Sequence, residues 1–98
     1  MSKLTIVASI TANPGQEEFV LSELQGLVSP TVSEDGCLQY DLHQDNENPA
    51  HFLFYENWAS RELWQNHTNS AHIQAYRERT KDAIKEIKLF EMTLVSPG

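Results

Sequence analysis

The sequence predicts an α+β fold of the ferredoxin-like type, a four-stranded antiparallel sheet with its helices on one face and the element order β-α-β-β-α-β. Three observations predict it. Apolar and polar residues alternate near both ends of the chain. They also alternate in two segments on either side of a short polar loop, and apolar residues recur at helical spacing in the stretches between these predicted strands. The 98 residues are the size of one domain, spanning 1–98.

The first half of the chain is predicted to hold a strand and a helix. Residues 3–12 alternate and are rich in β-branched side chains, which favour strands. An Asn-Pro-Gly sequence ends this strand, with Asn13 as the expected helix cap and Pro14 at the first helical position. Apolar residues at helical spacing cover 16–32, and Pro30 should kink or end this helix because proline lacks an N–H.

A hairpin is predicted in the middle of the chain. Alternation resumes after a turn at Asp35 and Gly36, and the polar loop 46–50 leads into a strand over 51–58. A loop of five residues places three facing pairs on one side of the sheet, whereas a four-residue loop would set the apolar row against polar residues. We therefore favour five. The facing pairs are Leu42 with Phe54, Tyr40 with Glu56, and Leu38 with Trp58.

The second half is predicted to hold two helical pieces and a final strand. Ser60 is the expected cap of a short helix that runs through Asn66. A Thr-Asn-Ser sequence at 68–70 interrupts it, and a second helical piece runs over 71–84. The alternation over 87–96 predicts the last strand.

Both faces of the predicted sheet carry apolar residues, although a sheet covered by helices on one face usually has a polar open face. In the third strand Leu53 and Tyr55 alternate with Phe52 and Phe54, and the last strand has the same two-sided pattern. The same face of a second copy is the simplest cover for such a surface. We therefore predict a homodimer, with two sheets packed together as a dimeric α/β barrel.

Composition excludes several classes of partner. The 14 acidic and 7 basic residues give a net charge of −7, which opposes binding to nucleic acid and to an anionic membrane. Apolar runs stay short of the roughly 18 residues that a membrane span needs. The single cysteine, Cys37, and the lack of a charged-then-apolar leader over 1–10 indicate the cytoplasm. A small hydrophobic or aromatic molecule is the expected ligand.

Three ordered segments resemble the antibiotic biosynthesis monooxygenase family, and in particular its quinol-monooxygenase-like members. The Glu-Asp-Gly-Cys-Leu-Gln-Tyr-Asp-Leu sequence at 34–42 looks like the family's second strand. Residues 48–58, which include Asn-Pro and end in Tyr-Glu-Asn-Trp, look like its third strand. The family's leucine, two histidines and tyrosine that follow correspond to Leu63, His67, His72 and Tyr76.

The resemblance implies a ferredoxin-like dimer with a pocket between helices and sheet. Relatives oxidise quinol or polycyclic substrates with molecular oxygen and no bound metal, flavin or other cofactor. It therefore implies a cofactor-independent monooxygenase for a quinol-like or polyphenolic molecule; the alternative is a small-molecule binding or isomerising dimer. The haem-degrading branch is disfavoured, because the positions of its Asn-Trp-His set hold Ser9, His67 and Arg77. The polyketide-oxidising branch's Asn and Tyr positions hold Phe54 and Trp64.

Two residues are the candidate catalytic groups. Glu56 places a carboxylate in an apolar row, where burial would raise its pKa and suit it to act as a general base; the alternative is a structural hydrogen-bond acceptor. His67 lies at the end of the short helix and can take and return a proton near neutral pH, or simply pack at the helix break. The candidate substrate-binding residues are Tyr40, Trp58, His72 and Tyr76.

No metal site is expected. On a continuous helix His67 and His72 would lie about 140° apart, so they do not make a natural pair of ligands. His43, Asp45 and His51 can cluster at the hairpin end, but no fourth ligand is evident there.

Overall fold

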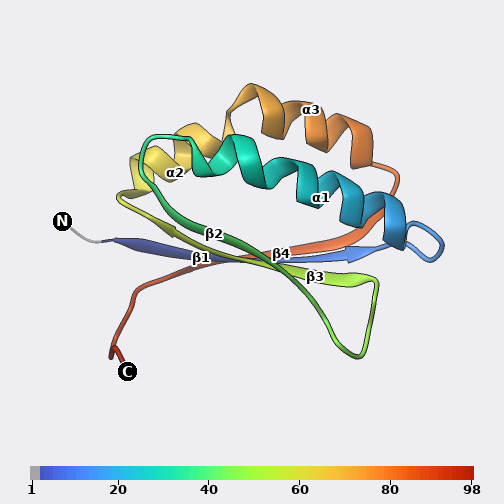
Figure 1. Cartoon of the computed structure of the whole chain (residues 1–98), viewed down its shortest axis with the longest axis horizontal. Helices are drawn as coiled ribbons and strands as arrows, with labels where there is room; N and C mark the ends of the chain where they lie inside the picture. Colours follow the sequence, from blue (N-terminus) through green and yellow to red (C-terminus); the bar gives the residue numbers. More distant parts are fainter. Residues whose placement is uncertain (1–2) are drawn as a thin grey trace.

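The computed structural model describes residues 3–98 and has three helices on one face of a four-stranded sheet (Figure 1). The antiparallel strands lie in the order β2-β3-β1-β4, so the predicted α+β ferredoxin-like fold is confirmed. Met1 and Ser2, which open the segment considered as a leader, lie outside the described residues. The elements are β1 (Leu4–Ala12), α1 (Glu17–Val32), β2 (Cys37–Gln44), β3 (His51–Trp58), α2 (Arg61–Thr68), α3 (Ala71–Thr80) and β4 (Ile84–Met92).

The hairpin of β2 and β3 has the predicted register over most of its length. Leu42 lies opposite Phe54, and Tyr40 lies opposite Glu56. The backbone N–H of Asp45 donates to the carbonyl of His51 (2.9 Å), which closes the five-residue loop 46–50. In the described part of the chain, no helix has the length and apolar character that crossing a membrane requires.

The third predicted pair of the hairpin is wrong. The register shifts between Cys37 and Gln39, so that Cys37 rather than Leu38 lies opposite Trp58. A bulge of this kind adds one residue to a strand and turns its side chain out of the ladder. Leu38 is accordingly 59% exposed.

The predicted start of α1 is also wrong. The cap residue is Gln16, and Asn13 instead ties the end of β1 to the loop before β4, because its side-chain amide donates to the carbonyl of Asp82 (3.1 Å). Gly15 follows with φ +87°, a conformation that glycine adopts without strain, so the Pro-Gly pair forms a turn outside the helix. Pro30 lies in the last turn, and the helix ends two residues later.

The last strand begins and ends earlier than predicted. Ser60 caps α2 as expected, its hydroxyl accepting from the N–H of Leu63 (3.2 Å), but α3 ends at Thr80 rather than near residue 84. β4 pairs with β1 as far as Met92, which lies opposite Thr5. Since β1 begins at Leu4, the chain after Met92 has no strand to pair with, and it leaves the body of the domain (Figure 1).

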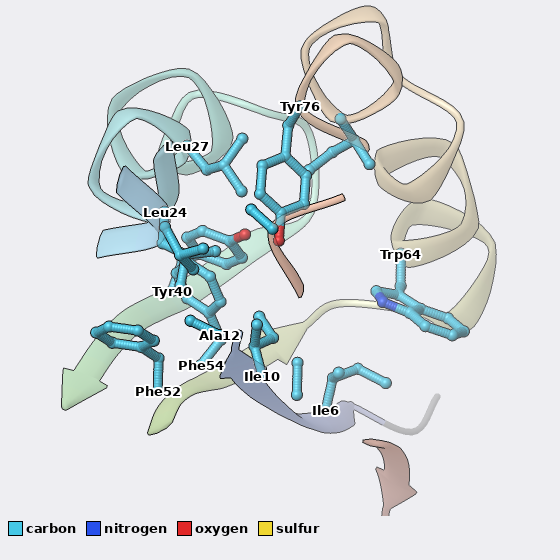
Figure 2. Close-up of a cluster of buried hydrophobic side chains, with 14 of the residues drawn as sticks. Ile6, Ile10, Ala12, Leu24, Leu27, Tyr40, Phe52, Phe54, Trp64 and Tyr76 are labelled. Atoms are coloured by element: carbon cyan, nitrogen blue, oxygen red, sulfur yellow. The ribbon is translucent and has the colours of Figure 1, made fainter. Parts of the chain in front are cut away.

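The hydrophobic core lies between the helices and the sheet (Figure 2). Side chains from the three helices and from β1, β2 and β3 meet there, and the most deeply buried large apolar side chains are Ile6, Val20, Leu24, Phe52, Phe54 and Trp58. The opposite face of the sheet is open and carries Tyr55, Phe90 and Met92, which are 38%, 43% and 48% exposed. The two-sided apolar pattern is therefore confirmed, and the homodimer that it suggests stays a prediction.

Candidate active site

A cavity of about 170 Å³ lies between the helical layer and the sheet, and its walls are mostly apolar. Four ionisable side chains that the sequence singled out line it: Tyr40, Glu56, His67 and Tyr76. They come from β2, β3, α2 and α3, so the fold gathers residues that are up to 36 positions apart in the sequence. Such a combination of an apolar pocket and a few convergent polar groups is typical of a small-molecule site.

Glu56 is brought into the core by the pleat of β3, which points every second side chain toward the helices. It is 4% exposed, and its Oε1 accepts a hydrogen bond from the indole Nε1 of Trp58 (2.9 Å). Burial raises the pKa of Glu56 to about 7; the nearby Glu34 carboxylate adds to the rise and the Trp58 hydrogen bond opposes it. Near neutral pH this group can therefore either give or take a proton.

His67 lies in the last turn of α2 and is 5% exposed. Its ring packs against the indole of Trp58 at 4.8 Å between centroids and meets the ring of Tyr40 edge-on at 5.5 Å. Its Nδ1 lies 2.9 Å from Oε1 of Glu34. Burial lowers the pKa of His67, although the Glu34 carboxylate opposes this, so the neutral imidazole is favoured.

The two tyrosines supply neutral hydroxyl groups. Figure 2 shows the hydroxyls of Tyr40 and Tyr76 pointing toward the same space between helices and sheet. Burial raises the pKa of Tyr76 to about 12 and raises that of Tyr40 still further, so both stay protonated and can donate hydrogen bonds. Within residues 3–98 the Tyr76 hydroxyl is buried without a partner, which leaves it free to bind a polar atom of a ligand.

Trp58 and His72, the other two predicted substrate-binding residues, do not line this cavity. Trp58 is fully buried and holds the Glu56 carboxylate through its indole N–H. His72 lies on α3, with its Nε2 3.0 Å from the hydroxyl of Thr31 on α1. Trp58 and His72 therefore lie behind the residues that line the cavity and help to hold them in position.

Glu34 is the residue that the sequence did not single out as part of the site. It lies in the turn between α1 and β2, and its two carboxylate oxygens approach His67 (2.9 Å) and His72 (3.2 Å). The expectation that these histidines would point apart assumed one continuous helix, and it is wrong. The break between α2 and α3 brings their rings to 6.0 Å. The signal available was that Glu34 opens the segment that carries the family resemblance.

Glu34, His67 and His72 each offer one ligand atom, and these atoms lie within 4.8 Å of one another. Two imidazoles and a carboxylate are a donor set that zinc accepts, but a structural site needs a fourth ligand, and no other His, Cys, Asp or Glu of the described chain joins this group. At the hairpin end, Oδ2 of Asp45 lies 3.0 Å from Nδ1 of His51, whereas the side-chain hydrogen bond of His43 is to the backbone carbonyl of Asp41 (3.2 Å).

The family model described as "Antibiotic biosynthesis monooxygenase" matches residues 3–79. The chain belongs to the antibiotic biosynthesis monooxygenase family. "Putative monooxygenase YcnE" of Bacillus subtilis is 30% identical over 83% of this chain and 85% of its own. "Probable quinol monooxygenase YgiN" of Escherichia coli is 27% identical over 97% of this chain and 98% of its own.

Solved structures of the family share the fold along nearly the whole chain. The crystal structure of PA3566 from Pseudomonas aeruginosa has a TM-score of 0.94 and 33% identity, and the match covers 98% of this chain and 97% of that one. A longer relative, the uncharacterized protein sll1783 of Synechocystis, is 25% identical over 91% of this chain, which spans only 63% of the relative's length. The fold that holds this cavity is thus the fold of a family in which YcnE and YgiN carry monooxygenase names.

Proposed function

We propose that this member of the family is a cofactor-independent monooxygenase that oxidises a quinol-like or polyphenolic small molecule with molecular oxygen, working as a homodimer in the cytoplasm. One observation carries the proposal: a largely apolar cavity is lined by two buried proton-transfer groups, Glu56 and His67, together with the two neutral tyrosines Tyr40 and Tyr76. Apolar walls suit an aromatic substrate, and the polar groups suit its hydroxyl oxygens. The name of the YgiN relative, a quinol monooxygenase, supports the same substrate class.

The reaction needs only proton transfer and binding from the protein. For a methylene group conjugated with a ring carbonyl, as in an anthrone, a base removes one proton to give a phenolate-type anion. The ring carbon of this electron-rich anion then adds molecular oxygen to give a peroxide. Loss of water from this peroxide leaves a ketone, so that R₂CH₂ and O₂ become R₂CO and H₂O. Glu56 and His67 move the protons, and Tyr40 and Tyr76 stabilise the anionic oxygen through hydrogen bonds.

The first prediction concerns oxygen uptake. In a metal-free buffer with chelator present, the protein should consume oxygen with at least one member of a panel of reduced quinones and anthrone-like phenols, faster than the spontaneous reaction. An oxygen electrode gives the rate, and product analysis distinguishes an inserted oxygen atom from simple two-electron oxidation. Rates equal to the spontaneous ones with every substrate, together with binding of the same compounds, would favour the alternative of a binding or isomerising dimer.

A second prediction concerns the dimer. The open face of the sheet is built around Val7, whose strand neighbours are Tyr55 and Phe90. Replacing Phe90 by Lys puts a charge on that face and should convert a dimer, of about twice the chain mass of 11.2 kDa, into a monomer. Light scattering after size exclusion measures the mass.

The matched control for the dimer is Ile87→Lys. Ile87 lies on the same strand and is also exposed, but it faces the helix side, opposite Ile10. This variant should remain a dimer. A wild-type protein that is monomeric at micromolar concentration, or equal dissociation of both variants, would contradict an interface formed by the open face.

A further inference from the structure

We infer that Glu34 is a positioning residue of the active site, one that holds the His67 imidazole with its hydrogen on Nδ1 and leaves Nε2 as the proton acceptor for the cavity. The inference rests on the proposed function, in which His67 moves the substrate proton. It assigns a separate role to each nitrogen of the ring: Nδ1 donates to Glu34, and Nε2 accepts the substrate proton. It also gives a role to a half-buried carboxylate that the reaction itself does not use.

Glu34 and His67 are in direct contact through their side chains. Oε1 of Glu34 lies 2.9 Å from Nδ1 of His67, which is the length of a charge-assisted hydrogen bond. An ionised carboxylate can only accept, so the hydrogen must lie on Nδ1. A neutral imidazole has one N–H, and Nε2 then carries a free lone pair. The burial of His67, at 5% exposure, favours this neutral form.

The His67 ring lies between two spaces. His67 lines the site cavity together with Tyr40 and Glu56, whereas Glu34 does not. Glu34 and His67 together line a different hollow at the start of β2, next to Leu63 and Asn66. The imidazole therefore forms part of the wall between these spaces. The nitrogen that Glu34 does not hold is the one available to the cavity, and no side chain of the described residues hydrogen-bonds it.

The Glu34 carboxylate and the His67 imidazole also have neighbours on other elements of the fold. The second carboxylate oxygen, Oε2, lies 3.2 Å from Nε2 of His72, whose ring is in turn held by the hydroxyl of Thr31 (3.0 Å). This approach is not a hydrogen bond, because Oε2 is buried without a hydrogen-bond partner in the described chain. The carboxylate is therefore held to the ring through Oε1, while the indole of Trp58 packs against the imidazole at 4.8 Å between centroids. Proton transfer is faster when the acceptor already has the correct orientation before the substrate binds.

The same three side chains, Glu34, His67 and His72, have the chemistry of a divalent-cation site, since their ligand atoms lie within 4.8 Å. The direct 2.9 Å contact favours the hydrogen bond, because it occupies the nitrogen of His67 that a cation would need. The test below separates the two assignments by adding a chelator or zinc.

The tautomer of His67 can be read directly. In ¹⁵N-labelled, chelator-treated wild-type protein at a pH where the imidazole is neutral, two-bond ¹⁵N–¹H correlations should show a protonated Nδ1 and an unprotonated Nε2. Glu34→Ala should shift His67 toward the tautomer with hydrogen on Nε2. Glu34→Gln should keep the hydrogen on Nδ1, because the amide oxygen can still accept. Asp35→Ala, at the exposed neighbouring position, should leave the His67 signals unchanged.

A rate measurement then separates positioning from mere folding. Glu34→Ala should lower kcat for oxygen uptake by about 10–100-fold with little change in KM, and Glu34→Gln should recover part of that loss. A wild-type His67 with hydrogen on Nε2, or signals that change when chelator is removed and stoichiometric zinc added, would overturn the inference. If no substrate is oxidised, the proposed function fails, and the tautomer measurement still decides whether Glu34 orients His67.

Discussion

Raising the pH from 4 to 8 should lower the free energy of unfolding of the wild-type protein by about 3 kcal/mol relative to a Glu56→Gln variant. The physical cause is burial, which raises the pKa of the Glu56 carboxyl from 4.5 to about 7 in the folded chain. Each unit of difference between folded and unfolded pKa is worth about 1.4 kcal/mol. Glutamine can still accept the hydrogen bond from Trp58, but it never has to become charged.

The direction follows from which state binds the proton. Below pH 4.5 Glu56 is protonated in the folded and the unfolded chain, so titration adds no difference between them. Between 4.5 and about 7 the unfolded chain releases the proton while the folded chain keeps it, and rising pH therefore favours unfolding. Above about 7 both states are ionised, and the loss of stability reaches its plateau.

Urea unfolding of both proteins across this pH range, at one fixed protein concentration, measures the effect. Glu18→Gln, which changes an exposed carboxylate on α1, is the matched control and should follow the wild-type curve. Parallel curves for wild type and Glu56→Gln would show that Glu56 ionises equally easily in both states. The pKa of Glu56 would then not be raised in the folded protein, and its carboxyl group would not be poised to exchange protons near neutral pH.

Alternation along the strands was enough to predict the sheet, because one side of each strand must face the core. The pairing of Tyr40 with Glu56 followed from requiring one apolar face and a five-residue loop. The bulge that displaces Leu38 could not be predicted in this way, since alternation alone does not show where a strand carries an extra residue. The end of β4 at Met92 depends on where β1 begins, because Met92 pairs with Thr5 near that end of β1. The residues of β4 alone do not show this limit.

The candidate site was predictable to the extent that it depends on strands. Glu56 enters the core because its neighbours two positions away do, and the structure brings Tyr40, His67 and Tyr76 to the same cavity. The link through Glu34 depends instead on the direction that α3 takes after the helix break. Spacing along a single ideal helix cannot supply that angle, so a contact across 33 residues was missed.

Removing the imidazole of His67 should lower the rate of oxygen uptake by about 10²–10⁴-fold, the usual contribution of a positioned acid–base group. His67→Ala also opens space beside Trp58 and Tyr40, so its loss of activity alone would not separate chemistry from packing. His67→Asn resolves this, because its side-chain amide can still donate to Glu34 while no atom replaces Nε2. Both variants should show the loss in kcat.

His43→Ala is the matched control, since it removes an exposed histidine on β2 that lies outside the cavity and hydrogen-bonds the backbone of its own strand. Its rate should equal that of the wild type. If His67→Asn keeps the full rate while Glu56→Gln loses it, the carboxylate is the base and the histidine only packs. If both substitutions lower kcat, and together by no more than the larger single effect, Glu56 and His67 act on the same proton-transfer step.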